Sequence, residues 1–501
     1  MKKEDLYELM GDIDENAVAD AEKPPARSRH RWINHAAAAA VFIAAFAGGV
    51  FFMAHFDRSN DKKYDDVATI PETADNAGFG YGIQNAVLAA AQYPEMPEYP
   101  DETKYPYGKG HEEAYSEWAS FKRELREQPP GYKDGYDTFF TSSVRTFLNG
   151  TGSGNMIYSP VSLYMALGMS AEITDGNTRQ QILDVLAQDD IDTLRQHFKS
   201  IWLANYNNDG MGSLVLADSL WLSNHYSYNK NTADLLADNY YSSVYSGDPG
   251  TEEYNSLMHD WLNKQTDGLL SDHVSGIEMP PDMFVMLAST VNYSGKWGQQ
   301  FNYNNTAPGT FHSPDADVQC DFMHDTKYDG LECGENFISI DLGLAGNGKM
   351  RLILPDEGIT PEELLGDDSV MKFMLGNTNY VTTKDVEVKL TVPKFDVSSS
   401  IDMIDGLQEL GITDLFSSES SDFSPLSDSA AGVSVSKVEQ DTRVTIDEEG
   451  CRASAFTVMV AMGGWLPDET AELTIDRPFI FEIISETGLP VFVGIVNDPT
   501  R

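Results

Sequence analysis

A single run of uncharged, mostly apolar residues near the amino terminus strongly constrains this chain. Residues 36–54 give 19 consecutive positions without a charge, with Trp32 before them and Phe56 after them. An α-helix of about 20 apolar residues is long enough to cross a bilayer. A buried helix of a globular core is the weaker interpretation, because so Ala-rich a segment stands alone between two polar stretches. The sequence therefore predicts one transmembrane helix over residues 35–56.

The residues before this run indicate a retained anchor rather than a cleaved leader. A signal peptide starts within a few residues of its basic region, whereas residues 1–34 are polar and rich in Asp and Glu. Basic residues flank the run unevenly: Lys23, Arg27, Arg29 and Arg31 precede it, and Arg58, Lys62 and Lys63 follow it. This slight bias favours a cytoplasmic segment 1–34 and a single-pass protein of the cell membrane.

Residues 57–131 lack the periodicity that builds a core. They contain the run Tyr93-Pro-Glu-Met-Pro-Glu-Tyr-Pro and many Gly and acidic positions, which predicts an extracellular acidic, Tyr/Pro-rich stalk. One piece has apolar residues at helical spacing within 112–128, namely Tyr115, Trp118, Phe121 and Leu125. We expect this stripe to dock onto the domain that follows rather than to bind a ligand.

Charge and cysteine content exclude several functions. The 501 residues carry 34 Lys+Arg against 79 Asp+Glu, a net charge of −45. Such a charge repels nucleic acids, heparin-like polyanions and anionic lipid. The three cysteines, Cys320, Cys333 and Cys451, are too few and scattered for a disulfide scaffold or a zinc site. We expect no metal and no cofactor.

Residues 132–501 form one large mixed domain with no comparable linker. Helical spacing occurs over 163–186 and 254–264, whereas 386–392 and 490–496 have the pattern of strands. Cys320 and Cys333 could form a bridge if their strands pair, but buried thiols are the commoner outcome.

Motifs of catalysis are incomplete. Gly343-Leu-Ala-Gly-Asn-Gly-Lys349 has the spacing of a phosphate loop, but Met350 follows where a Ser or Thr is needed, and a strand-like run replaces the helix. Asn347-Gly348 instead predicts a hairpin turn. His259-Asp260 and His324-Asp325 lack a His-Glu-x-x-His or Gly-x-Ser-x-Gly partner motif. We expect no enzyme activity.

The carboxyl-terminal third contains two distinctive segments, residues 473–481 and Val444-Thr-Ile-Asp-Glu-Glu-Gly450-Cys-Arg-Ala-Ser-Ala-Phe-Thr457. The latter resembles the reactive-loop hinge of the serpin family, and residues 473–481 resemble that family's carboxyl-terminal signature. Further blocks follow in the family's order over about 365 residues: Asn155 to Leu163, Gly176-Asn-Thr178, Leu214 to Asn224, Thr266-Asp-Gly268, Gly295-Lys-Trp297, Leu352 to Glu357, Val392-Pro-Lys-Phe395, Leu410 to Asp414, Asp422-Phe-Ser424 and Val435 to Val438.

The resemblance implies an α+β serpin fold with three β-sheets, surrounding helices and an exposed reactive-centre loop. It also implies a suicide substrate. A protease attacks the loop, the cleaved loop inserts as a strand into the main sheet, and the acyl-linked protease is distorted.

The residues of the hinge suit insertion. The resemblance assigns it Glu448, Glu449, Gly450, Cys451, Ala453, Ala455 and Thr457. After Gly450, the residues from Cys451 to Thr457 alternate between two faces, and the face that the family buries carries small, uncharged side chains. Neither a charge nor a Pro interrupts 453–465, so nothing there stalls insertion.

The scissile bond lies, by the family pattern, between Ala461 and Trp465, with Met462, Gly463, Gly464 and Trp465 as candidates. A basic residue is absent from 458–466, which disfavours a trypsin-like target. Elastase-like, chymotrypsin-like and subtilisin-like serine proteases fit the Val, Ala and Met side chains, and a papain-like cysteine protease is the other option.

Two residues at the centre of the expected main sheet depart from the family. The usual Asn and His are replaced, by spacing, by Ser289 and Gln440, whereas Ser159 and Ser162 are retained. A Gln amide supplies both a donor and an acceptor, so a rearranged hydrogen-bond network is expected there.

Three functions follow. The leading one is a monomeric, membrane-anchored inhibitor, integral to the membrane through one helix, that traps an extracellular protease; its single domain and signal-anchor start suggest a bacterial source. The second is a non-inhibitory serpin that acts as a surface binding, carrier or chaperone protein, against which the small hinge residues argue. The third, an enzyme, lacks a catalytic constellation.

Overall fold

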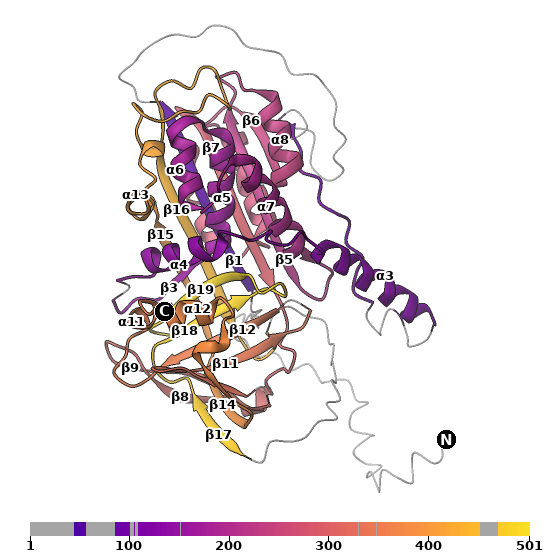
Figure 1. Cartoon of the computed structure of the whole chain (residues 1–501), viewed down its shortest axis with the longest axis vertical. Helices are drawn as coiled ribbons and strands as arrows, with labels where there is room; N and C mark the ends of the chain where they lie inside the picture. The colour runs from indigo at the N-terminus through magenta and orange to yellow at the C-terminus, as the bar shows by residue number, and fades with distance from the viewer. Residues whose placement is uncertain are drawn as a thin grey trace, which may run out of the picture. The chain divides into compact units, whose positions relative to one another are not determined.

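The structure is a computed structural model that describes residues 45–56, 86–100, 105, 109–150, 152–328, 330–346, 348–450 and 469–501. Contacts divide the chain into a unit of residues 1–41, outside the described residues, and a unit of residues 42–501. The second unit contains three β-sheets with helices packed around them (Figure 1).

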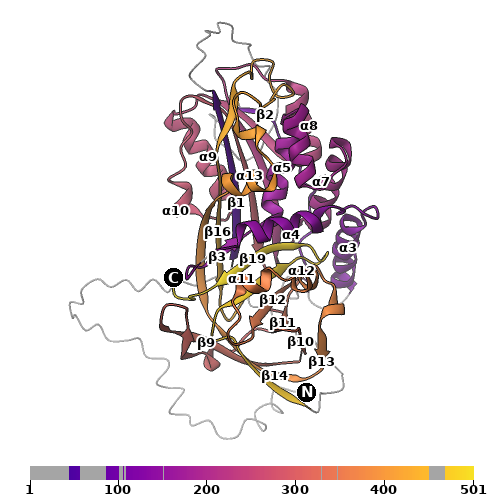
Figure 2. The same cartoon turned by 60° about the vertical axis from the view of Figure 1, so that its left-hand side comes forward.

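The largest sheet has eight strands in the order β15-β16-β1-β7-β5-β6-β2, with β4 paired to β5. Its strands are β1 (Ala45–Phe56), β2 (Val87–Ala89), β4 (Asn207–Asn208), β5 (Ser213–Ser223), β6 (Ser242–Gly247), β7 (Met283–Ser294), β15 (Phe395–Asp402) and β16 (Val433–Ile446). We call it the main sheet. Helices cover both of its faces, as the turned view shows with α9 and α10 on one side and α5, α7 and α8 on the other (Figure 2). Strands buried on both faces are expected to be continuously apolar, as β7 mostly is.

The second sheet has the order β13-β10-β11-β12-β18-β19-β3, and the third has the order β17-β14-β9-β8. The strands of the second are β3 (Met156–Tyr158), β10 (Leu331–Cys333), β11 (Phe337–Leu344), β12 (Gly348–Pro355), β13 (Thr382–Lys384), β18 (Phe479–Ile484) and β19 (Pro490–Val496). Those of the third are β8 (Ala307–His312), β9 (Asp317–Lys327), β14 (Glu387–Pro393) and β17 (Thr470–Thr474).

The central helix is α5 (Pro160–Ile173), every residue of which is buried. Ser159 caps it by accepting a hydrogen bond from the Ser162 N–H, and Pro160 occupies the first helical position, where a missing N–H costs nothing. The other α-helices are α3 (Lys109–Arg126), α4 (Tyr136–Phe147), α6 (Gly176–Val185), α7 (Ile191–Asn205), α8 (Lys230–Tyr240), α9 (Glu252–Gln265), α10 (Ser271–Val274), α11 (Pro361–Leu365), α12 (Asp368–Met374) and α13 (Ile404–Leu410). Short 3₁₀ helices are η1 (Tyr303–Asn305), η2 (Thr378–Tyr380) and η3 (Asp414–Phe416).

The expected transmembrane helix is corrected in its second half. Residues 45–56 form strand β1, which pairs antiparallel with both β16 and β7, while residues 35–44 lie outside the described residues. Among the helices of the described chain, none combines the length and apolar character needed to cross a bilayer. The apolar run suits either environment, because a strand covered on both faces needs the same uncharged residues as a membrane helix.

Part of the expected stalk packs on the domain. Strand β2 pairs with β6 at the edge of the main sheet, and the ring of Tyr93 lies 5.0 Å from that of Trp202 and 6.3 Å from that of Tyr241, measured between centroids. These contacts show that the Tyr/Pro-rich run is held by aromatic packing.

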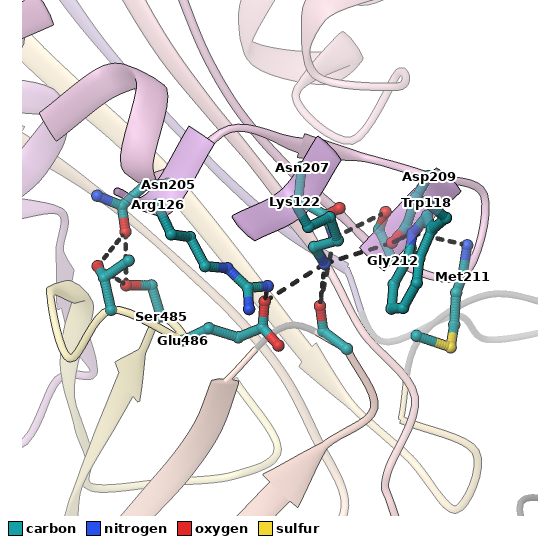
Figure 3. Close-up of polar contacts among 12 residues, drawn as sticks. Trp118, Lys122, Arg126, Asn205, Asn207, Asp209, Met211, Gly212, Ser485 and Glu486 are labelled. Carbon is teal, nitrogen blue, oxygen red and sulfur yellow. Dashed lines mark hydrogen bonds and ion pairs between the residues drawn. The ribbon is translucent and has the colours of Figure 1, made fainter. Parts of the chain in front are cut away.

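Helix α3 docks through a buried polar cluster (Figure 3). Lys122, which is 4% exposed, has its Nζ 3.4 Å from Asp209 Oδ2 and 3.3 Å from Glu486 Oε2. Trp118 Nε1 donates to the same Asp209 oxygen at 3.1 Å. The helix predicted within 112–128 is therefore present as α3 and packs on the domain. Tyr115 of its apolar stripe is 46% exposed, however, and the charged contacts of Lys122 hold the helix where a continuous apolar face was expected.

Other expectations can be compared with the structure directly. The hairpin prediction is confirmed, since β11 and β12 pair antiparallel with Leu344 opposite Gly348. The predicted strand at 490–496 coincides with β19. Cys320 and Cys333 are free thiols on strands of different sheets, so the strand pairing that a bridge would need is not formed.

Candidate functional site

Strand β16 leaves the main sheet through a tightly held segment, residues 447–450, which we call the hinge anchor. Trp297, 4% exposed, donates from Nε1 to the Asp447 carbonyl at 2.8 Å, and its N–H donates to the Glu449 carbonyl at 3.2 Å. The N–H of Phe301 donates to the Glu448 carbonyl at 3.0 Å. Three successive carbonyls of the hinge anchor are therefore bound to residues 297–301.

Glu448 is the most buried carboxylate of this segment, with 2% exposure. Its Oε1 accepts from Thr306 Oγ1 at 2.6 Å, and its Oε2 accepts from Lys394 Nζ at 2.7 Å. Burial alone pushes the pKa of Glu448 up, but the hydrogen bonds from Lys394 and Thr306 outweigh it and leave the pKa below its ordinary value. The buried charge is thus paired and hydrogen-bonded, as a stable buried carboxylate requires.

The two neighbouring acids differ in environment. Burial raises the pKa of Asp447 to about 6, although the Glu449 N–H donates to its Oδ1 at 2.9 Å. Glu449 accepts instead from the exposed hydroxyl of Tyr303. Adjacent acids of the hinge anchor therefore differ: hydrogen bonds stabilise the charge of Glu448, whereas burial destabilises the charge of Asp447.

Gly450 ends the hinge anchor in a conformation that favours glycine. Its φ is +86°, and a Cβ at this position would lie 2.3 Å from the Trp297 backbone nitrogen. Both constraints require a residue without a side chain. The hinge residues that follow, Cys451, Ala453, Ala455 and Thr457, and the scissile-bond candidates 462–465 lie outside the described residues. The chain is described again from 469, and β17 then pairs in parallel with β14.

The four residues expected at the sheet centre are brought together beneath α5. Gln440 accepts from the Ser159 N–H at 2.8 Å through Oε1 and donates to the Ser159 carbonyl at 3.0 Å through Nε2. Ser162 Oγ donates to the Ser289 carbonyl at 3.3 Å. The Gln amide uses its donor and its acceptor on one residue, and it ties β16 to the start of α5.

Sequence reasoning missed a buried acid in the same row of the sheet. Asp218 on β5 lies opposite Ser289 on β7 and is 1% exposed. Neither of its carboxylate oxygens has a hydrogen-bond partner among the described residues. Burial raises the pKa of Asp218 to about 7, while the nearby Ser289 hydroxyl acts in the opposite direction. Only the three-dimensional pairing of strands shows that this acid is buried without an ion pair to any described residue.

Within the described ranges, no three or more His, Cys, Asp or Glu side chains are grouped so that they could hold a metal ion. The hinge anchor emerges from the main sheet, and residues 451–468, which follow it, lie outside the described residues. Strand β17 then pairs with β14 in the third sheet.

Comparison with known proteins identifies the family that has this arrangement. The family profile described as "Serpin (serine protease inhibitor)" matches residues 135–499. The chain belongs to the serpin family. Among curated serpins, it is 26% identical over 390 residues to alpha-1-antiproteinase of Rattus norvegicus, covering 75% of this chain and 92% of the relative. It is also 27% identical over 391 residues to Serpin-Z4 of Hordeum vulgare, covering 73% and 96%.

Solved serpin structures agree. The native state of tengpin, a thermophilic serpin, superposes with a TM-score of 0.63 at 25% identity, over 74% of this chain and 95% of tengpin. Human thyroxine-binding globulin superposes with the same TM-score at 20% identity, over 75% of this chain and its whole length, a similarity that concerns the fold alone. The serpin fold with three sheets, expected from the sequence, is confirmed.

Three other hinge-anchor contacts also escaped sequence reasoning. Lys394, Thr306 and Tyr303 hold Glu448 and Glu449 from segments 54 to 146 residues away in the chain. Lys394 lies within the block Val392-Pro-Lys-Phe395, and that block was the available signal. Nothing in its sequence, however, indicates that the ammonium group meets a buried carboxylate.

Proposed function

We propose that this serpin inhibits serine proteases as a suicide substrate. The observation that carries the proposal is the course of the chain at the hinge. The buried strand β16 continues through the restrained Gly450 directly into alternating small, uncharged residues. A segment that starts beside β16 can turn back and pair with it as a new strand, and small alternate side chains fit the face that must be buried.

The covalent step is ordinary acyl transfer. The protease serine hydroxyl attacks the carbonyl of the scissile peptide bond, the C–N bond breaks, and the amine of the downstream peptide leaves with the proton from the catalytic base. The upstream loop then remains esterified to the protease. If insertion forms about ten main-chain hydrogen bonds at roughly 1 kcal/mol net each, it contributes on the order of 10 kcal/mol. That is comparable with the stability of a whole protease domain.

The loop sequence favours target proteases whose specificity pocket accepts an apolar side chain. Residues 458–466 read Val-Met-Val-Ala-Met-Gly-Gly-Trp-Leu and contain no cation for an acidic specificity pocket. We propose cleavage after Met462 or Gly464 by an extracellular elastase-like, chymotrypsin-like or subtilisin-like enzyme. A cysteine protease is the other class that this segment would accept.

The second candidate is a non-inhibitory serpin that acts as a binding, carrier or chaperone protein. One specific observation favours it: β1 already pairs with both β16 and β7 in the main sheet. A strand that stayed there permanently would leave no place for the loop beside β16.

A matched pair of hinge variants in the full chain tests the leading proposal. Ala455→Asp places a charge on the face expected to be buried, whereas Ser454→Asp places the same charge on the opposite face. Each protein is titrated against elastase, chymotrypsin and subtilisin, and residual protease activity is measured. We expect Ala455→Asp to be cleaved as a substrate while Ser454→Asp inhibits like the wild type. Equal inhibition by both variants would contradict insertion.

A further inference from the structure

Strand β1 occupies the centre of the main sheet although it comes from the far amino-terminal part of the chain. It lies between β7 and β16, and eleven of its residues are in register with each neighbour. Figure 1 shows this indigo strand between the orange β16 and the pink β7. Nearly 230 residues separate β1 from the nearer neighbour in sequence, so it enters the sheet as a separate segment.

Side chains of β1 contribute to the packing on both faces of the sheet. Phe52 and Ala54, 3% and 1% exposed, belong to the large core that includes α5. Phe51, 4% exposed, belongs to a second core formed with Trp221 and Trp261 on the opposite face. A strand that lay loosely in a gap would not fill two cores at once.

The direction of β1 matters as much as its position. It runs antiparallel to β16, with Phe46 opposite Val444 and Phe56 opposite Val433. A segment that leaves β16 at Ile446 and folds back as a hairpin would also run antiparallel to β16, along the same side of that strand and in the same direction as β1. Residues 45–56 and a returning loop would therefore compete for the same main-chain partners on β16 and β7, and both cannot be present.

We infer that residues 45–56 act as an internal plug of the loop-insertion slot, and that the inhibitor traps proteases only after this strand is withdrawn. The inference rests on the proposed function for the loop and adds its regulation. It also explains how one chain can have a hinge suited to insertion and a main sheet that is already complete. In the plugged form the loop would be cleaved as an ordinary substrate, so the wild type would trap only the small fraction of protease that meets a chain whose strand is withdrawn, and this fraction is what the hinge variants change.

The test uses the full chain with Val50→Pro and, as its matched control, Val50→Thr. Val50 pairs with Gln440 and Ser289 in the middle of β1. Proline cannot take part in a central ladder, whereas threonine keeps the N–H and suits a strand. Hydrogen–deuterium exchange reports whether residues 45–56 are in the sheet. Titration against elastase, chymotrypsin and subtilisin reports the fraction of protease trapped.

We expect slow exchange over residues 45–56 in the wild type and in Val50→Thr, and fast exchange in Val50→Pro. The fraction of protease trapped should rise at least about tenfold in Val50→Pro, because a lost ladder bond and a ring clash expel the strand. Phe51→Asp, which puts a charge into the core with Trp221, supplies a second variant if Val50→Pro does not fold. Fast exchange of residues 45–56 in the wild type, or unchanged trapping once protection is lost, would overturn the plug.

A peptide separates failure of the plug from failure of the proposed function. A synthetic peptide of residues 450–461, kept reduced, is mixed with each protein, and binding is read by native electrophoresis. Binding to Val50→Pro but not to Val50→Thr, with no protease trapped by either, supports the plug and refutes the proposed inhibition. Equal binding to both variants overturns the plug whatever the proteases show.

Discussion

Replacing Gln440 with alanine should weaken the main sheet at its attachment to α5. The side-chain amide accepts from the Ser159 N–H at 2.8 Å and donates to the Ser159 carbonyl at 3.0 Å, and both residues are 0% exposed. The carbonyl keeps a second donor, because the Leu163 N–H also bonds to it at 3.3 Å. The penalty therefore falls mainly on the Ser159 N–H, which is left buried without a partner.

The expected loss can be worked from these contacts. A hydrogen bond contributes about 1 kcal/mol net, and an orphaned buried donor costs a further 1–3 kcal/mol or so. The sum is about 2–4 kcal/mol in the free energy of unfolding. With a urea m value of about 3 kcal/mol/M, the denaturation midpoint should fall by roughly 1 M.

The assay is urea denaturation followed by near-ultraviolet circular dichroism. Glu439→Ala is the control, since this half-buried neighbour lies next to Gln440 on the same strand, and its replacement should change the free energy of unfolding by only about 0.5 kcal/mol. A loss below about 1 kcal/mol for Gln440→Ala would refute the argument that the amide joins β16 to α5.

Four further outcomes are expected. Because burial raises the pKa of Asp218 to about 7, ionisation of this acid should destabilise the protein as pH rises from about 4 through 7. Asp218→Asn should remove this contribution, while Asp447 keeps its own, and should stabilise the protein by on the order of 3 kcal/mol at pH 8 in denaturation curves. Arg351→Met should cost about 2–3 kcal/mol in the same assay, because Asp341 loses the hydrogen bonds that the buried Arg351 donates from Nε at 2.8 Å and from Nη2 at 3.1 Å. Lys394→Met should raise amide exchange in residues 447–450, with a stability loss of about 1–2 kcal/mol, because Glu448 loses its cation. Tyr93→Ala should cost about 2 kcal/mol and speed limited proteolysis of residues 86–100, since it removes the ring packed against Trp202.

The fold could be predicted from the sequence because its signals are local, and the hinge stays a prediction that rests on the same kind of signal. Small alternate residues after Gly450, and blocks such as Gly295-Lys-Trp297, keep their spacing whatever surrounds them. The glycine itself has a visible cause in the structure, a positive φ against the Trp297 backbone. The partners of Glu448 could not be read, because burial and pairing depend on segments that meet only in the fold.

The apolar run at residues 36–54 shows where pattern reasoning fails. Its length and lack of charge predict a membrane helix, yet Ala45–Phe56 is a strand with Phe51 and Phe52 in cores on opposite faces of the sheet. Both environments exclude water from every side of the segment, so the same residues satisfy either. Hydrophobicity predicts that a segment is buried, but it does not tell whether lipid or the rest of the protein covers the segment.

The intact mass of the denatured product tests covalent trapping most directly. The full chain and Val50→Pro are each incubated with elastase, chymotrypsin and subtilisin, and the products are analysed by mass spectrometry in denaturant. Trapping predicts a species equal to the chain plus the protease, less a carboxyl-terminal peptide whose mass locates the bond cut within residues 461–465. Two cleaved fragments beside free, active protease, for both proteins and all three enzymes, would contradict it.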